Sequence, residues 1–366
     1  MEEQREEFVR LARQPDANVS ELCRRFDISR KTGYKWLARE EMSDRSRRPV
    51  HSPARTPPEI EARVVEIRQA HPAWGGRKIA KVLQRDAAVC LSPGTVTWVL
   101  HRHGLICADA SEASKAWTRF EHPRPNALWQ IDFKGHVGMG TQRCHPLTVI
   151  DDHSRFNLVL QALSGEGRET VQAALLKAFQ HYGLPERINA DNGPPWGSGA
   201  RGVTALGVWL IRHGISISHS RPFHPQTNGK DERFHRTLKA EVLNRYHCES
   251  LEQWQQRFDC WRAIYNCKRP HEALAMKTPI ERYSVSPRRW PTSLPPIEYG
   301  ARDETRLVQA EGIVKFKGRR LRTSAALQGQ PVGLRPLDDC EGVYDVFYCH
   351  QRVDRFDLNE VKSHVD

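Results

Sequence analysis

The chain of 366 residues carries a formal net charge of +12, from 56 Lys and Arg against 44 Asp and Glu. This length exceeds one ordinary domain, and the cationic excess favours a polyanionic partner. No apolar run approaches the roughly 18 residues that span a bilayer, and the opening MEEQREEFVR is charged. These features exclude an integral membrane protein and predict a multidomain, cytoplasmic protein without membrane association.

Residues 1–42 are predicted to form a helix-turn-helix module that binds DNA. Apolar residues recur at helical spacing on either side of a short turn, with Ser20 and Ser29 placed to cap the two helices. Arg30 and Lys31 open the second helix, at the end that meets bases and phosphates in such modules. A plain helical hairpin without DNA contact is the alternative.

Residues 43–56 are predicted to form a basic, proline-rich linker, because they contain no apolar repeat. Within it, Arg45, Arg47 and Arg48 are candidates for contacts with phosphates or a minor groove. A solvated tether explains the same composition equally well.

Residues 57–106 contain three segments with helical spacing of apolar residues, which predicts a second helix-turn-helix of the winged type. The last segment begins with Ser92 and Pro93, a cap followed by proline at the first helical position. Two modules in tandem suit a long DNA site better than either alone.

Residues 120–290 are predicted to form an α/β core, because the apolar period changes to that of strands at about residue 124. The predicted order is three meandering strands, a helix ending at Gly183, then strand, helix, strand and helix. This order matches a ribonuclease-H-like fold.

Residues 298–366 read as short alternating strands with glycine turns, which predicts a small β-barrel of the Src-homology-3 kind. In the segment IVKFKGRRLR, apolar residues alternate inward while Lys315 and Lys317 point outward, and Arg319 follows. One face of this domain is therefore expected to be cationic and to contact DNA.

Two acids of the core are predicted to converge. Asp132 lies in the middle of the first strand, with Ile131 and Phe133 on the opposite face. Asp191 stands at the carboxyl end of the fourth strand. If these strands are neighbours, the two carboxylates lie close together, and such like charges favour a hard cation between them, Mg²⁺ or Mn²⁺.

A third acid is chosen by helical geometry from the adjacent pair Asp231 and Glu232. At about 100° per residue from Phe234, Asp231 falls near 60°, inside the apolar stripe of the helix. On the same scale Glu232 falls near 160°, beside Arg236 and Lys239. We therefore expect Glu232 to be a metal ligand, and Asp231 to be a helix-start acid favoured by the macrodipole.

The motifs WQIDF, VIDDHSR, DNGPPW, HPQTNGKDERFHRTLK and YNCKRPHEAL resemble bacterial insertion-sequence transposases of the Asp-Asp-Glu type, relatives of retroviral integrases. The resemblance extends over almost the whole chain. It implies that Asp132, Asp191 and Glu232 are the catalytic metal ligands and hold two Mg²⁺ or Mn²⁺ ions. It further implies DNA contacts near the metal site and at the transposon end, by Asn192, His224, Gln226, Asn228, Arg236 and Lys239.

The resemblance implies a nucleoid-associated enzyme that binds the terminal inverted repeats of an insertion sequence, cleaves their 3′ ends and transfers them into target DNA. It also implies a homo-oligomer on double-stranded DNA, either a dimer or a tetramer. Two rivals stay open: a DNA-binding regulator with an inactive core, and a ribonuclease-H-like nuclease without strand transfer. The regulator would have no reason to keep three consistent carboxylates, and the nuclease would not need tandem DNA-reading modules.

Other conspicuous residues have structural explanations. The pair Asp151 and Asp152 follows a strand and is predicted to cap a turn. The segment YNCKRPHEAL is predicted to pack a helical extension on the core, with DNA contacts by Arg269 and His271 as the alternative.

Overall fold

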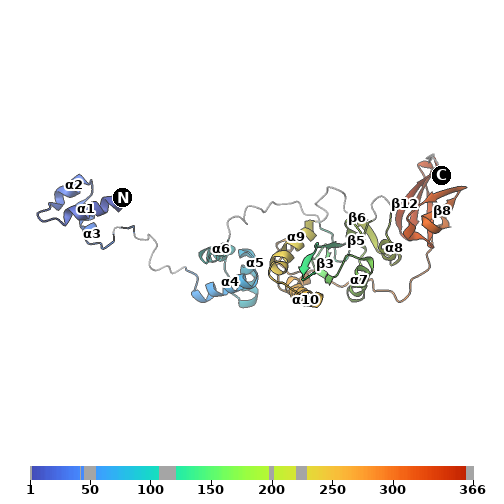
Figure 1. Ribbon diagram of the computed structural model, residues 1–366, viewed down its shortest axis with the longest axis horizontal. Coiled ribbons are helices and arrows are strands. Elements are labelled where there is room, and N and C mark those ends of the chain that lie inside the picture. The colour runs from blue at the N-terminus through green and yellow to red at the C-terminus, as the bar shows by residue number, and fades with distance from the viewer. Residues whose placement is uncertain are drawn as a thin grey trace. The chain divides into compact units, whose positions relative to one another are not determined.

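The computed structural model describes residues 2–41, 43–44, 55–106, 121–197, 202–219 and 229–359. The chain divides into two compact units, Met1–Pro58 and Glu59–Asp366 (Figure 1). No helix within the described ranges is long and apolar enough to cross a membrane. The predicted linker contacts Arg45, Arg47 and Arg48 lie outside the described residues.

The first unit is a bundle of three short helices around Phe8, which is fully buried. Ser29 caps the third helix as predicted, because its side chain accepts a hydrogen bond from the backbone N–H of Thr32. The second helix is capped by Asn18 and not by Ser20. The helices are α1 (Glu2–Ala12), α2 (Val19–Arg25) and α3 (Arg30–Leu37), of which α1 was not predicted.

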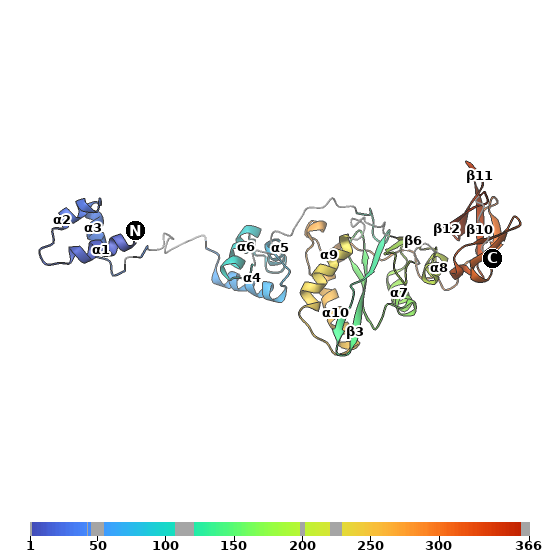
Figure 2. The ribbon, with the colours of Figure 1, turned by 45° about the horizontal axis from the view of Figure 1, so that its top comes forward.

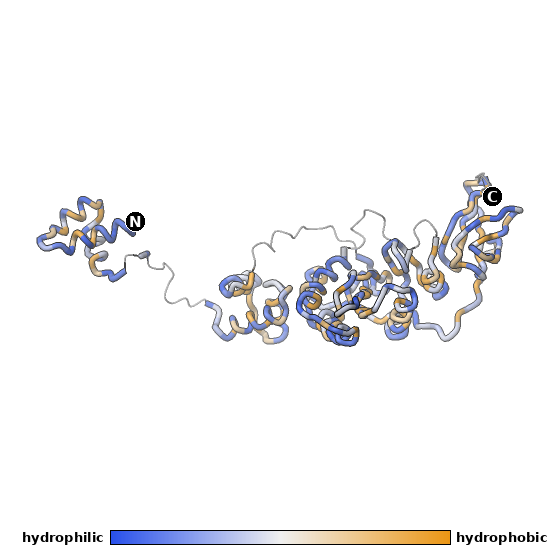
Figure 3. Tube along the Cα trace, in the orientation of Figure 1, coloured by the Kyte–Doolittle hydropathy of each residue, from blue (hydrophilic) through white to orange (hydrophobic). Residues whose placement is uncertain are grey.

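The second unit begins with another bundle of three helices, in which apolar and polar residues alternate along the chain (Figure 3). Ser92 caps the last of them and Pro93 follows it, as predicted. The helices are α4 (Pro58–Ala70), α5 (Gly76–Ala87) and α6 (Pro93–Arg102). Residues 55–106 contain no strand, so the predicted wing has no counterpart among them.

A six-stranded sheet forms the centre of the core domain. Its path is β2-β3-β1-β5-β6, and β4 pairs with β3. β1 is antiparallel to β3 and parallel to β5, which confirms the predicted neighbourhood of the first strand and the strand before Asp191. The short β2 was not predicted. The strands are β1 (Trp129–Phe133), β2 (Val137–Met139), β3 (Gln142–Asp151), β4 (Asn157–Leu163), β5 (Arg187–Ala190) and β6 (Ser216–His219).

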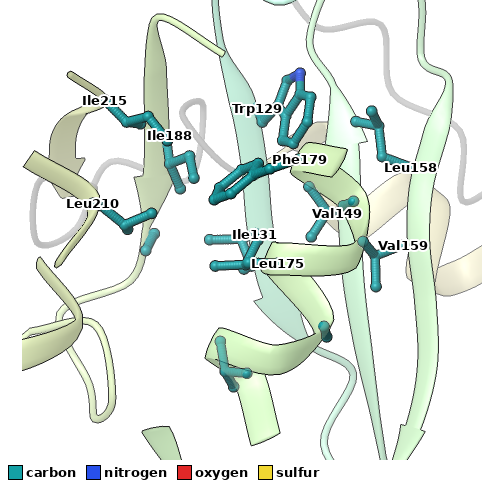
Figure 4. Packing of buried hydrophobic residues seen from close by; sticks show 14 of the residues in the cluster. Trp129, Ile131, Val149, Leu158, Val159, Leu175, Phe179, Ile188, Leu210 and Ile215 are labelled. Carbon is teal, nitrogen blue, oxygen red and sulfur yellow. The ribbon is translucent and has the colours of Figure 1, made fainter. Parts of the chain in front are cut away.

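Helices cover both faces of this sheet, with α7 on one side and α9 and α10 on the other (Figure 2). On the α7 side, Phe179 and Leu175 pack against Trp129, Ile131 and Val149 (Figure 4). The helices are α7 (Arg168–Tyr182), α8 (Ala205–Arg212), α9 (Gly229–Leu238), a π-helix (Lys239–Leu243) and α10 (Leu251–Cys267). α7 ends at Gly183, whose φ of 78° explains the predicted stop.

The C-terminal strands form a four-stranded sheet, in the order β12-β11-β10-β7, and a separate hairpin of β8 and β9. The two sheets share a core that includes Val314 and Phe316. The predicted closed barrel is not confirmed, because no strand pairing in the described residues joins the hairpin to the larger sheet. The strands are β7 (Glu304–Leu307), β8 (Ile313–Phe316), β9 (Arg319–Arg322), β10 (Pro331–Leu337), β11 (Cys340–Tyr348) and β12 (Gln351–Asp357). Short 3-10 helices lie at Glu272–Leu274, Pro279–Glu281, Ala310–Gly312 and Ala325–Leu327.

Candidate active site

Asp132 lies in β1, and Asp191 directly follows β5, the parallel neighbour of β1. In the parallel pairing of β1 and β5, Gln130 is opposite Asn189, and two further residues along each chain lead to Asp132 and Asp191. Ile131 belongs to the cluster on the α7 side, so the side chain of Asp132 points to the opposite face, as predicted.

The surroundings of Asp132 disfavour its charged form. Burial, followed by the negative charge of Asp191, raises the pKa of Asp132 to about 6. The backbone N–H of Phe133 donates to Oδ1 of Asp132 over 2.8 Å and opposes part of this shift. A carboxylate beside a second carboxylate in a half-buried position gains most from a cation, which would favour both charged forms.

Asp191 is exposed and is held by the loop that follows it. The backbone N–H of Gly193 donates to Oδ1 of Asp191 over 3.1 Å. A Cβ atom at position 193 would lie 3.3 Å from Oδ2, so glycine leaves this oxygen more room than another residue would. Asn192, between them, is exposed, and its predicted DNA contact stays a prediction.

In the first turn of α9, the adjacent acids Asp231 and Glu232 point to different environments. Asp231 is buried together with the apolar residues of its helix, whereas Glu232 is exposed, which confirms the helical-face prediction. Burial, then the charges of Asp132 and Asp152, raises the pKa of Asp231 well above its usual value. Asp231 lies in the first turn of α9 as expected, although its burial disfavours the charged form that the helix macrodipole would stabilise.

Glu232 is not brought into contact with the other two predicted ligands. It forms no hydrogen bond or ion pair with a described residue, and the described ranges contain no group of three His, Cys, Asp or Glu side chains arranged to hold a metal ion. The structure thus joins Asp132 with Asp191, and places Glu232 on a helix that packs beside β1.

The predicted DNA contacts fall into three groups. Those in α9, Arg236 and Lys239, are exposed on the side of Glu232, and Lys239 begins the π-helix. Those outside the core are also exposed, in the first turn of α3 and in the hairpin of β8 and β9: Arg30, Lys31, Lys315, Lys317 and Arg319. His224, Gln226 and Asn228 lie outside the described residues.

Asp151 and Asp152 both belong to the fold, but in different ways. Asp151 caps the turn as predicted, since Oδ1 accepts from the backbone N–H and the hydroxyl of Ser154. Asp152 instead forms a buried ion pair with Lys230, the residue before Asp231. This pair connects the first turn of α9 to the end of β3, and no local pattern of residues predicted it.

His235 and Thr148 are a second contact that sequence analysis missed. Thr148 Oγ1 lies 2.9 Å from Nε2 of His235, and Nδ1 of the same ring lies 3.8 Å from Oδ2 of Asp132. Burial lowers the pKa of His235 to about 3, so the ring is uncharged. The position three residues after Glu232 on one helix was the available signal, because such residues lie on adjacent turns.

Arg269 and His271 are buried, which favours their structural explanation over DNA contact. Arg269 Nε lies 3.5 Å from Oε1 of Glu241, also buried. Burial lowers the pKa of His271 well below its usual value.

Comparison with known proteins identifies the modules of the chain. Integrase core domain models match residues 122–225 and 213–279, and the model of the C-terminal domain of IS481 family transposases matches residues 303–364. A helix-turn-helix model matches residues 4–49, and a homeodomain-like model matches residues 32–100.

Two similar proteins come from bacterial insertion elements. A 39.2 kDa protein of IS476 from Xanthomonas euvesicatoria is 26% identical over 244 residues, covering 63% of this chain and 67% of that protein. A 31.7 kDa protein of IS407 from Burkholderia multivorans is 26% identical over 226 residues. This match covers 61% of this chain and 79% of that protein. These matches together support an insertion-sequence transposase with an integrase-like core.

Solved structures similar to this chain include retroviral integrases. The intasome of simian T-cell lymphotropic virus, in complex with the regulatory subunit B56 gamma of PP2A, contains a chain that is 16% identical. The match covers 81% of this chain and 96% of that one, with a TM-score of 0.40. The integrase catalytic core domain of HTLV-2, solved with magnesium in a trimeric form, is 18% identical. This match covers 45% of this chain and 100% of that one, with a TM-score of 0.35.

Proposed function

We propose that this chain is a DNA transposase that binds the ends of an insertion sequence and catalyses metal-dependent 3′-end cleavage and strand transfer into target DNA. The observation that supports this most strongly is the placement of Asp132 in β1 beside Asp191, which directly follows the neighbouring strand β5. Neither acid forms an ion pair with a Lys or Arg of the described residues.

The donor set fits Mg²⁺ or Mn²⁺, because carboxylate oxygens are the ligands that these ions prefer. Each of Asp132 and Asp191 has one oxygen that accepts a backbone N–H and a second without a hydrogen-bond donor in the described residues. We assign these two acids and Glu232 as the ligands. Two divalent ions at this position would supply Lewis-acid activation of the attacking hydroxyl and stabilisation of the leaving oxygen.

The residues of α9 orient the site and the DNA. The ion pair of Lys230 with Asp152 holds the start of the helix on β3, and the burial of Asp231 turns Glu232 outward. Arg236 and Lys239, exposed on the same side, are proposed to bind phosphates of the transposon end, where each would act as a fixed cation.

The domains divide the work in this proposal. The modules at residues 1–42 and 57–106 would recognise the end sequences, and the cationic hairpin of β8 and β9 would bind DNA without sequence preference. One chain has one set of three acids while an element has two ends, so at least two protomers would act together on DNA at the nucleoid.

The test is a strand-transfer assay that uses short labelled duplexes carrying the ends of the parent element and a supercoiled target plasmid. The proposal expects 3′ cleavage and joined products that require Mg²⁺ or Mn²⁺. Specific end binding without any cleavage would instead indicate a regulator, and cleavage without joined products would indicate a nuclease.

A further inference from the structure

Lys134 follows Asp132 by two residues and lies on the same side of the core sheet. β1 ends at Phe133, but its pairing with β3 continues for one more position, because the backbone N–H of Lys134 donates to the carbonyl of Pro146 over 3.0 Å. Ile131 and Phe133 pack on the α7 side of the sheet. Side chains alternate along a strand, so those of Asp132 and Lys134 point to the opposite face, which α9 covers (Figure 2).

The positive charge of Lys134 reaches the candidate metal site. Burial and the charge of Asp191 raise the pKa of Asp132, and the charge of Lys134 opposes this rise. Burial also lowers the pKa of His235, whose ring lies 3.8 Å from Asp132, and the charge of Lys134 adds to that effect. Residues two apart on a strand are separated by about 7 Å, a distance that the four-carbon stem of a lysine can cover. The ammonium group can therefore meet a ligand that is held at Asp132.

Lys134 has no anionic partner among the described residues. Its side chain is partly exposed and forms no ion pair or hydrogen bond with any of them. Glu166, whose charge also reaches the site, lies 2.8 Å from Nδ1 of His145 instead. Lys230, by contrast, forms its buried ion pair with Asp152. A lysine that lies beside acids and pairs with none of them is available to an anionic group of a substrate.

We propose that Lys134 is a substrate-binding residue of the active site, whose ammonium group donates to a non-bridging oxygen of the phosphodiester that is cleaved or joined. Asp132, Asp191 and Glu232 contribute only negative charge, whereas a phosphodiester is itself an anion. A fixed cation stabilises the negative charge on the phosphate oxygens in the transition state. Lys134 keeps its proton throughout, while the attacking oxygen bonds to phosphorus and the bond to the leaving oxygen breaks. The inference rests on the proposed function, because it assigns a further residue to the same reaction.

Two variants at position 134 and one control separate the charge of the side chain from its place in the sheet. Lys134→Met keeps an unbranched stem and removes the charge, and Lys134→Arg keeps a positive charge. Lys177→Met is the control, because Lys177 is exposed on α7, on the other side of the sheet. The measurement is single-turnover 3′ cleavage of a labelled element end by the full chain, in Mn²⁺ and over a range of DNA concentrations.

We expect Lys134→Met to cleave saturating DNA about 100-fold more slowly than wild type, the usual cost of removing one donor to a transition-state oxyanion. Lys134→Arg should be at least about tenfold faster than Lys134→Met, and Lys177→Met should cleave at the wild-type rate. The DNA concentration at half-maximal rate should change by less than about threefold, because one phosphate contact among many adds little to end binding. A loss of less than about tenfold in Lys134→Met, or equal losses in the two variants, would overturn the inference.

Mn²⁺ binding, measured by titration calorimetry without DNA, distinguishes phosphate binding from damage to the metal site. Removing a positive charge beside Asp132 should leave the affinity of Lys134→Met for Mn²⁺ unchanged or make it tighter, although cleavage is slow. Weaker Mn²⁺ binding in this variant would overturn the inference, because the slow cleavage would then follow from the metal. If wild type itself does not cleave element ends, the proposed function fails. A cleaving wild type beside a fully active Lys134→Met would contradict the inference alone.

Discussion

Two pairs of acids in the core domain differ in what contacts their oxygens. Each carboxylate oxygen of Asp151 and Asp152 accepts a hydrogen bond from a backbone or side-chain donor of the protein. In Asp132 and Asp191 only one oxygen of each does so within the described residues.

The difference separates acids that stabilise the fold from acids that are available for chemistry. Burying a charge costs free energy unless hydrogen bonds or an opposite charge compensate, and Asp152 has both in Gln130 and Lys230. Asp132 accepts only one hydrogen bond in the described residues and forms no ion pair with a Lys or Arg there. Its burial is therefore less compensated, and the pKa of its carboxyl is raised to about 6. A cation from solution would compensate the buried charge of Asp132, so we expect a cation to bind at Asp132 and not at Asp152.

Substituting the incompletely bonded acids should have the largest effect. Asp132→Asn, Asp191→Asn and Glu232→Gln should each lower cleavage and strand transfer by about a thousandfold or more, because metal ions contribute several kcal/mol to such reactions. Binding of the element ends, measured by gel shift, should stay nearly unchanged. If Asp132→Asn lost less than about tenfold of its cleavage and strand-transfer activity, the proposed difference between the two pairs of acids would be wrong.

Breaking the buried ion pair should cost stability instead. Lys230→Met leaves the buried Asp152 without its cation and should lower the free energy of unfolding by about 3 kcal/mol, measured by urea denaturation. The double variant with Asp152→Asn should recover part of this loss. Lys239→Met, at an exposed position, is the control and should change stability by less than about 0.5 kcal/mol. Equal effects of the two lysine variants would contradict the assignment.

The pKa of Asp132 predicts how metal binding depends on pH. Because the pKa is raised to about 6, a proton competes with the cation below that pH and is absent above it. The affinity for Mn²⁺ should therefore be highest above pH 7 and fall by up to about tenfold for each pH unit below 6. An affinity that is constant from pH 5 to pH 8 would show that Asp132 does not bind the ion.

Asp231→Asn should have the smallest effect of these substitutions, and it should raise the free energy of unfolding instead of lowering it. The pKa of Asp231 is raised, so the folded wild type loses stability as the pH rises from the usual carboxyl value through the folded one. Asparagine carries no such charge, so the variant should be more stable than wild type at pH 8, and no more stable at pH 4, as measured by urea denaturation at both pH values. Strand transfer should be retained. An inactive Asp231→Asn beside an active Glu232→Gln would reverse the roles of the two acids.

Local patterns predicted those parts of the site that depend on neighbouring residues. Alternation in β1 gave the face of Asp132, and helical spacing gave the burial of Asp231 and the exposure of Glu232. Strand order then placed Asp191 beside Asp132. Each of these follows from a backbone period and from one correct strand pairing.

The features that were missed depend on contacts between distant segments. Lys230 meets Asp152 across 78 positions, and His235 meets Thr148 across 87, so no local period reports either contact. The predicted small C-terminal β-barrel is not confirmed for a similar reason. Alternation predicts strands, but closure depends on which edges pair, and here β8 and β9 pair only with each other in the described residues.

The most direct test of the central claim is to map where a divalent ion binds along the chain. Fe²⁺ bound in place of Mg²⁺, with ascorbate and peroxide, generates radicals that cut the nearby backbone, and the fragments can be identified by mass spectrometry. The account predicts cuts close to Asp132, Asp191 and Glu232 that excess Mg²⁺ suppresses and that Asp132→Asn abolishes. Cuts that persist in Asp132→Asn, or that cluster on the far side of the fold from β1, would contradict it.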